Sequence, residues 1–87
     1  MHVRYTIRIG ETALADLEKL PRHVADQVLR RIALLENNLH GDIKKLRGDD
    51  SRYRLRCGNY RVLFKLSGTG VLIVRVKHRK EAYGNGR

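Results

Sequence analysis

The sequence predicts an α+β domain in which a helical hairpin packs on one face of a mainly antiparallel four-stranded sheet, in the order β-α-α-β-β-β. Three observations predict this fold class. Residues 2–9 alternate between apolar and polar side chains, as in a half-buried strand, and residues 11–39 carry apolar side chains at helical spacing. Residues 53–77 return to alternation and contain two glycine-bearing turns.

Length and composition predict one domain over residues 1–87 with a strong positive charge. The chain has 19 Lys and Arg against 9 Asp and Glu, a formal net charge of +10. Such an excess favours a polyanionic or acidic partner without specifying nucleic acid. We expect a cytoplasmic protein, because the sequence lacks an apolar run of the roughly 20 residues that span a bilayer and a signal-like apolar segment. The single Cys57 excludes an intrachain disulfide and a cysteine-rich zinc site.

The first strand is predicted over residues 2–9 and ends at Gly10. The side chains expected on its core face are Val3, Tyr5, Ile7 and Ile9. Residues 11–20 follow as a short amphipathic helix. Its apolar stripe consists of Ala13, Leu14, Leu17 and Leu20.

A second helix is predicted after Pro21, which suits the first helical turn because the N–H that proline lacks is not needed there. Its apolar stripe consists of Val24, Val28, Leu29, Ile32, Leu35 and Leu39. Two helices joined by so short a break are expected to form a helical hairpin. Residues 40–52 are polar and are interpreted as a connector.

Three further strands are predicted over residues 53–57, 60–66 and 71–77. The turn at 58–59 has glycine first, which suits a type II′ hairpin, and residues 67–70 form the second turn. The core is expected to include Leu17, Val28, Ile32, Leu35, Val62, Phe64 and Val74. Two tyrosines, Tyr53 and Tyr60, are expected to pack on the same core face.

Turn lengths predict which side chains face one another. The 58–59 turn sets Cys57 opposite Tyr60 and Arg56 opposite Arg61. A second loop of residues 67–69 sets Arg61 opposite Arg75. It also pairs Phe64 with Leu72 and Val62 with Val74 on the core face.

The predicted register forms a row of Arg56, Arg61 and Arg75 across three strands, although like charges directly opposite destabilise a sheet. No strand position from 53 to 77 is acidic. One interpretation is a solvated face that aids solubility, but such faces normally mix both signs. We favour an anion-binding surface on the uncovered side of the sheet, because the arginine fork suits phosphate. We expect Arg61→Ala to fold normally, since it relieves repulsion.

Several short runs together resemble the RelE branch of the RelE/ParE toxin superfamily. They are Lys45-Leu46-Arg47-Gly48, Tyr53-Arg54-Leu55-Arg56, Gly58-Asn59-Tyr60-Arg61-Val62-Leu63-Phe64, Val76-Lys77-His78-Arg79 and Tyr83. Each run alone is weak. The Gly-x-Tyr-Arg turn, the apolar strand and the terminal His-Arg-x-x-x-Tyr are fairly specific in combination, and the predicted element order agrees over essentially the whole chain.

The resemblance implies a RelE-like microbial RNase fold and a toxin of a prokaryotic type II toxin–antitoxin pair. RelE-type toxins enter the ribosomal A site and cut the messenger RNA there. The implied partners are therefore the ribosome, mRNA and a cognate antitoxin that holds the toxin inactive in a hetero-oligomer, with no membrane involved.

The resemblance also implies a catalytic set, which consists of Arg54, Arg56, Arg61, Arg79 and Tyr83. The first two arginines stand where RelE has paired lysines, and arginine stays charged where lysine can lose a proton. Surrounding basic residues are expected to contact RNA: Lys45, Arg47, Lys65, Arg75, Lys77, His78 and Lys80.

RNA cleavage by the neighbouring 2′-hydroxyl needs a base, a cation cluster and an acid. The arginines supply the cations, but proton carriers are few. His78 is either structural or a proton carrier, and Glu81 is a nearby carboxylate that can simply pair with an arginine. Tyr83 either stacks on a base, acts as a base if cations lower its pKa, or packs against the sheet edge. We expect no metal or cofactor, because the remaining histidines lack metal-ligand spacing.

Two other functions remain open on this sequence. One is a ParE-like toxin that inhibits DNA gyrase on the same fold and cuts no RNA. The other is an inactive module that binds a partner or RNA. Tyr83 favours the RelE-like toxin over the ParE-like toxin, because ParE-like chains tend to lack a tyrosine after His-Arg.

Overall fold

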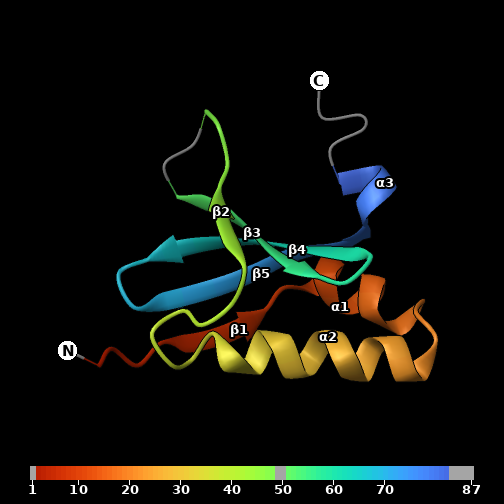
Figure 1. Ribbon diagram of the computed structural model, residues 1–87, viewed down its shortest axis with the longest axis horizontal. Helices are drawn as coiled ribbons and strands as arrows, with labels where there is room; N and C mark the ends of the chain where they lie inside the picture. The colour runs from red at the N-terminus through yellow and green to blue at the C-terminus, as the bar shows by residue number, and fades with distance from the viewer. Residues whose placement is uncertain (1, 49–50, 83–87) are drawn as a thin grey trace.

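The structure, a computed structural model, describes residues 2–48 and 51–82 (Figure 1). Within these residues the order of elements is β-α-α-β-β-β-β, followed by one short helix. The strands are β1 (Thr6–Ile9), β2 (Ile43–Lys45), β3 (Arg52–Cys57), β4 (Tyr60–Ser67) and β5 (Gly70–His78). The helices are α1 (Glu11–Glu18), α2 (Arg22–Leu34) and α3 (Arg79–Ala82). None of these helices is long and apolar enough to cross a membrane.

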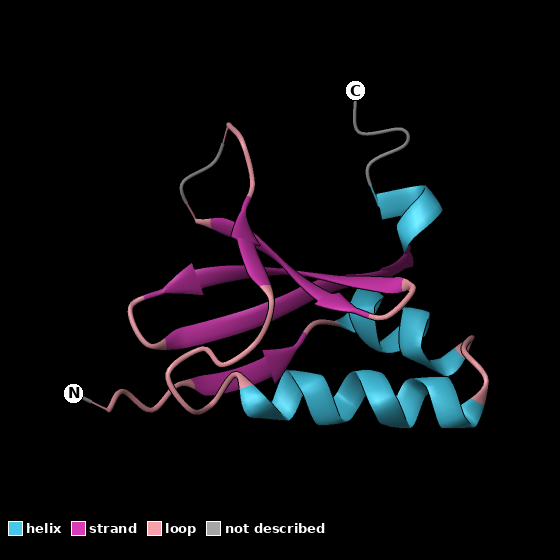
Figure 2. Ribbon diagram, in the orientation of Figure 1, coloured by secondary structure: helices cyan, strands magenta, loops and turns pink. Residues whose placement is uncertain are grey.

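The strands form one sheet in the order β1-β5-β4-β3-β2, in which β1 is parallel to β5 and the other neighbours are antiparallel. Helices α1 and α2 lie on the same face of this sheet (Figure 2). The predicted α+β class is therefore confirmed. The strand count was wrong by one, because β2 lies inside the polar segment interpreted as a connector. It is a three-residue edge strand, too short to show alternation.

The first strand is shorter than predicted. Only residues 6–9 pair with β5, and they do so in parallel. The preceding residues run beside the end of α2, where the Tyr5 N–H donates to the Glu36 carbonyl at 2.9 Å. At the other end, Gly10 approaches β5 so closely that a Cβ there would lie 3.1 Å from the Ile73 carbonyl oxygen. This contact turns the chain from β1 into α1 and accounts for a glycine at that position.

Both helices lie within the segments that the sequence predicts, but α2 ends at Leu34, and Leu39, which the prediction placed in its apolar stripe, lies beyond the helix with φ 55°. Helix α1 begins after Gly10 and lies over β5, whereas α2 begins after Pro21 and lies over β3 and β4. Part of each predicted apolar stripe is exposed, since Leu14 is 50% and Leu29 39% accessible. The helices therefore meet the sheet along narrower faces than the sequence suggests.

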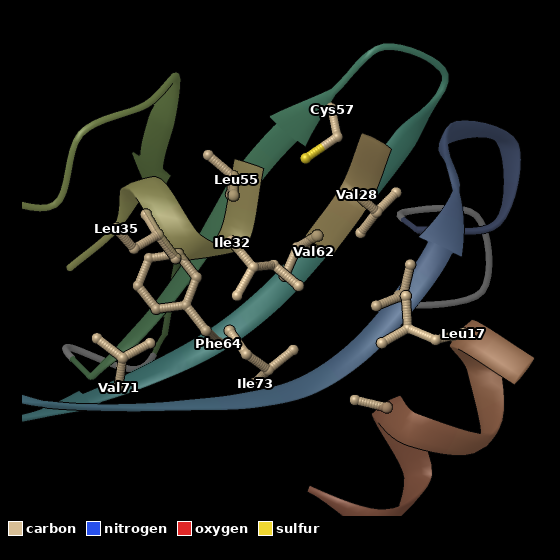
Figure 3. Close-up of a cluster of buried hydrophobic side chains, with 12 residues drawn as sticks. Leu17, Val28, Ile32, Leu35, Leu55, Cys57, Val62, Phe64, Val71 and Ile73 are labelled. Atoms are coloured by element: carbon tan, nitrogen blue, oxygen red, sulfur yellow. The ribbon is translucent and has the colours of Figure 1, made fainter. Parts of the chain in front are cut away.

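The core lies between the helices and the sheet (Figure 3). Its buried side chains are Ala13, Leu17, Val28, Ile32, Leu35, Leu55, Cys57, Val62, Phe64, Val71, Ile73 and Val76. Tyr53 stacks on Phe64 with ring centroids 5.6 Å apart, as expected for core packing. Six of the seven predicted core residues are confirmed. The seventh, Val74, is only half-buried.

The register of β3 and β4 is as predicted, with Arg56 opposite Arg61. The turn between them has Gly58 at φ 57°, and Asn59 is not among the residues with positive φ, which fits a type II′ turn.

The register of β4 and β5 differs from the prediction. The loop has two residues, so Ser67 pairs with Gly70, and Val74 then forms a β-bulge. The predicted pairs Phe64–Leu72, Val62–Val74 and Arg61–Arg75 were wrong. The observed partners are Phe64 with Ile73, Val62 with Val76, Leu63 with Arg75 and Arg61 with Lys77.

Asp16 of α1 binds the edge of β5 beyond the residues that pair with β1. Its Oδ2 accepts the Val76 N–H at 2.8 Å and the Arg75 Nε–H at 2.8 Å, and its Oδ1 lies 3.2 Å from Arg75 Nη2. Burial raises the pKa of the Asp16 carboxyl, but the hydrogen bonds and charge of Arg75 and the Val76 N–H lower it more, so the net shift is downward. The folded state therefore stabilises the ionised form of Asp16 relative to its protonated form.

This linkage predicts a pH-dependent loss of stability. Because the folded pKa lies below the ordinary 3.8, the contribution of Asp16 is present above that pH and is lost as pH falls through the folded pKa. Urea unfolding of wild type and Asp16→Asn is expected to show wild type more stable at neutral pH, with the difference shrinking below about pH 4. A difference in unfolding free energy that stays constant down to pH 3 would contradict this role.

Candidate nucleic-acid interface

The face of the sheet opposite α1 and α2 carries the basic side chains that the sequence singles out. We call it the open face, because no described helix lies flat over it; residues 46–48, which follow β2, and helix α3 rise at its two ends (Figure 1). By alternation, the side chains that β3, β4 and β5 contribute to it are those of Arg52, Arg54, Arg56, Arg61, Leu63, Lys65, Leu72, Arg75 and Lys77.

The register brings Arg56, Arg61 and Lys77 opposite one another on three adjacent strands. The predicted basic row therefore exists, with Lys77 in place of Arg75. Arg75 instead binds Asp16 of the helical layer, so its charge is already paired. No acidic side chain occurs along β3, β4 or β5, and the row keeps its mutual repulsion.

Arg61 is largely buried rather than presented to solvent. It is 8% accessible, and its Nη1 donates to the carbonyl oxygens of Gly58 at 2.8 Å and Tyr60 at 2.9 Å. The same turn accepts the Arg79 N–H at the Asn59 carbonyl, 2.7 Å away. The Arg61 side chain therefore stabilises the β3–β4 turn, and the Asn59 carbonyl of this turn binds the first residue of α3.

Arg54 lies deep in the open face, with 13% of its side chain accessible. Its Nη1 lies 3.3 Å from the Asp42 carbonyl oxygen and 3.6 Å from Asp42 Oδ1. Its Nε is buried and has no hydrogen-bond partner within the described residues. An unpaired N–H on a buried cation is costly. Because Nε is enclosed, a phosphate oxygen cannot reach it in this conformation, and an anion can meet only the accessible part of the Arg54 side chain.

Asp42 is one residue of the open face that sequence reasoning missed. It precedes β2, its carbonyl accepts the Arg56 N–H at 2.9 Å, and its Oδ2 lies 4.0 Å from Arg56 Nη1. Its half-exposed carboxylate thus stands beside both Arg54 and Arg56. A prediction of β2 would have revealed Asp42, because the antiparallel pairing of β2 with β3 places residue 42 beside the end of β3. Lys44, which pairs with Arg54, was missed for the same reason.

The remaining predicted RNA contacts are divided between surfaces. Lys65 and Lys77 lie on the open face, and Arg47 is exposed in the turn after β2. Lys45 pairs with Tyr53, a core-layer residue, so by alternation it projects toward the helical side of the edge strand.

The end of β5 and α3 bring further cations to the turn. The His78 ring meets Tyr60 edge-on at 5.3 Å, and its Nδ1 accepts the Lys80 N–H at 3.2 Å, which leaves Nε2 to carry the proton of the neutral ring. Arg79, Lys80 and Glu81 are exposed. The predicted catalytic Tyr83 lies outside the described residues.

The described residues offer little nucleophilic or metal chemistry. Burial raises the pKa of the Cys57 thiol to about 11, although Arg31 and Arg61 partly oppose this shift. The thiol therefore stays protonated at neutral pH and is a poor nucleophile. Over residues 2–48 and 51–82, no three His, Cys, Asp or Glu side chains gather as metal ligands. What the open face can do chemically is bind anions and stabilise developing negative charge.

Known proteins are similar to this chain in both sequence and fold. The chain matches a family profile described as the ParE toxin of the type II toxin–antitoxin system parDE over residues 7–83. It is 33% identical over 82 residues to the toxin RelE3 of Methanocaldococcus jannaschii, covering 88% of this chain and 93% of the relative.

Two solved complexes extend this similarity to the fold. One is the RelBE2 toxin–antitoxin complex of Mycobacterium tuberculosis, with TM-score 0.76 and 34% identity over 91% of this chain and 95% of that chain. The other is the RelE–RelB complex of Pyrococcus horikoshii OT3, with TM-score 0.73 and 26% identity over 92% of this chain and all of that chain (100%).

The hydrogen bonds of Arg61 revise the expectation that Arg61→Ala folds normally. Losing a charged donor to two carbonyls is expected to cost about 1.5–3 kcal/mol. Arg56→Ala is the matched control, because it relieves the same cross-strand repulsion from a side chain that is mostly exposed, and it is expected to stay within about 0.5 kcal/mol of wild type. Urea unfolding of both variants measures the difference; equal stabilities would mean that the two carbonyl contacts contribute nothing.

Proposed function

The chain belongs to the RelE/ParE superfamily of type II toxin–antitoxin toxins, and on that premise we propose that it is an endoribonuclease that cleaves mRNA in the ribosomal A site. This activity would inhibit translation in the cytoplasm until a cognate antitoxin neutralises the toxin. The observation that carries the proposal is the open face, where Arg56, Arg61 and Lys77 lie opposite one another and no acidic residue occurs along β3, β4 or β5.

The charge of the open face suits the transition state of RNA cleavage. In this reaction a base takes the proton of the 2′-hydroxyl, the 2′ oxygen attacks phosphorus, and the bond from phosphorus to the 5′ oxygen breaks. An acid gives a proton to the leaving 5′ oxygen, so the products are a 2′,3′-cyclic phosphate and a 5′-hydroxyl. Negative charge grows on the phosphoryl oxygens as the attack proceeds. Arg54 and Arg56 can bind those oxygens as preorganised cations, and Arg61 supports them by holding the turn beside Arg56.

Proton transfer has fewer candidates than charge stabilisation. Asp42 supplies a carboxylate beside Arg54 and Arg56, and His78 supplies an imidazole near the end of the basic row. Tyr83 keeps the role that the family resemblance implies for it. So sparse a set suits an enzyme whose substrate is positioned by the ribosome, because orientation alone can lower a barrier by several kcal/mol (about 7–11 in well-oriented intramolecular reactions).

An antitoxin is the second partner of this proposal. The solved relatives are toxin–antitoxin complexes, and the excess of 19 basic over 9 acidic residues favours a partner with acidic segments. Such a partner would cover the open face and compete with RNA for the same cations.

The family profile favours a second candidate function, the ParE-like inhibition of DNA gyrase. This activity would need a protein-binding surface and no RNA cleavage. Supercoiling by purified gyrase therefore separates the two candidates: inhibition of gyrase with intact messages would support the ParE-like activity and would reject the endoribonuclease.

The endoribonuclease is tested in a cell-free translation reaction with purified, antitoxin-free protein. Primer extension on the message is expected to reveal cuts within ribosome-bound codons. Arg54→Ala is expected to lower the cleavage rate by about 10²-fold or more, the usual effect of deleting a preorganised charge stabiliser. Arg22→Ala, which removes the same charge from the start of α2, serves as the control and should cleave like wild type. Equal cleavage by Arg54→Ala and Arg22→Ala would remove Arg54 from the site.

A further inference from the structure

A groove with a volume of about 590 Å³ opens at the end of the sheet where β1, β4 and β5 meet. Its lining includes Thr6 and Arg8 from β1, Lys65 and Ser67 from β4, and Gly70 and Leu72 from β5. The neighbouring Ile7 and Val71 pack toward the core, so the alternating Thr6, Arg8 and Leu72 face away from the helices. The groove therefore belongs to the open face.

The residues that line this groove suit an anionic ligand that also carries an apolar surface. Arg8 and Lys65 form no salt bridge with any described residue, and no described acidic side chain lines the groove. Thr6 and Ser67 add hydroxyl groups, which can bond to ribose or phosphate oxygens. Leu72 is 39% accessible and offers an apolar surface between the cations.

Gly70 leaves space in the groove because it has no side chain. Gly70 pairs with both Thr6 and Ser67 at the point where β5 begins, and it presents no side chain. A Cβ there would already lie 3.2 Å from the Ser67 carbonyl oxygen. Gly70 therefore contributes only backbone to the lining, whereas Arg8 and Lys65 contribute long side chains.

We propose that this groove binds a nucleotide of the single-stranded RNA that flanks the scissile phosphate, with Arg8 and Lys65 on its phosphates and Leu72 against its base. The proposal rests on the proposed function. Arg61, Leu63 and Lys65 all lie on the open face of β4, and Arg61 pairs with Arg56. Lys65 follows Arg61 by four residues, so the two Cα atoms are about 13 Å apart along the strand. A single strand that crosses Arg54 and Arg56 can thus continue over Lys65 to Arg8.

Salt-dependent RNA binding tests the groove independently of cleavage. The probe is a fluorescent single-stranded RNA that carries 2′-O-methyl groups and therefore cannot be cut. Its affinity is measured by anisotropy at several salt concentrations for wild type, Arg8→Ala, Lys65→Ala and the control Arg22→Ala. Each lost phosphate contact is expected to reduce the slope of log affinity against log salt by about 0.7.

The proposal expects Arg8→Ala and Lys65→Ala each to show the reduced slope, and Arg22→Ala to keep the wild-type slope although it loses the same charge. Leu72→Ala is expected to lower affinity at fixed salt without changing the slope. Slopes for Arg8→Ala and Lys65→Ala that equal that of Arg22→Ala would overturn the proposal. Unchanged RNA binding combined with weaker binding of polyglutamate would also overturn it, in favour of an acidic polypeptide.

Failure of this proposal is distinguishable from failure of the proposed function. If wild type cuts messages during translation while the groove variants bind RNA with the same slope as Arg22→Ala, only the groove is rejected. If wild type leaves messages intact while the groove variants lose slope, the endoribonuclease is rejected and the RNA site stands.

Discussion

The β-bulge at Val74 is the irregularity on which the arrangement of the sheet depends. Before it, Val71 and Ile73 face the core; after it, Val76 does, because the additional residue reverses the alternation. Without the bulge, either the first or the second half of β5 would turn its apolar side chains to solvent. The same shift brings Lys77 opposite Arg61 and sends Arg75 to Asp16 of α1. One extra residue thus sets both the core and the distribution of charge.

The charge of the open face conflicts with the stability of the sheet, and the structure shows how the conflict is contained. Arg61 donates to two turn carbonyls, Asp42 lies beside Arg54 and Arg56, and Asp16 forms an ion pair with Arg75. On the opposite face, Phe64, Leu35 and Leu55 are fully buried and supply the compensating stability. Repulsion kept at one surface of a domain this small is expected where an anion relieves it, which is why the function is assigned to the open face.

Much of this organisation could be predicted from the sequence. The alternation of residues 53–66 and the glycine at position 58 predicted the β3–β4 hairpin with its register, and Pro21 predicted the start of α2. The bulge could not be predicted, because Val74 stands in a continuous apolar run where either register buries valines or isoleucines. Asp42 was missed because β2 is too short to alternate, and the burial of Arg61 follows from carbonyls that only the folded turn presents. The groove depends on the parallel pairing of β1 with β5, which joins residues over 60 positions apart.

The central claim, that the open face is the surface that meets RNA on the ribosome, is tested most directly by lysine reactivity. The toxin is acetylated alone and with mRNA-programmed ribosomes, and modification at each lysine is measured by mass spectrometry. Lys65 and Lys77 lie on the open face, whereas Lys19 ends α1 on the helical layer. The account predicts that ribosomes protect Lys65 and Lys77 and leave Lys19 reactive. Protection of Lys19 with undiminished modification of Lys65 and Lys77 would contradict it.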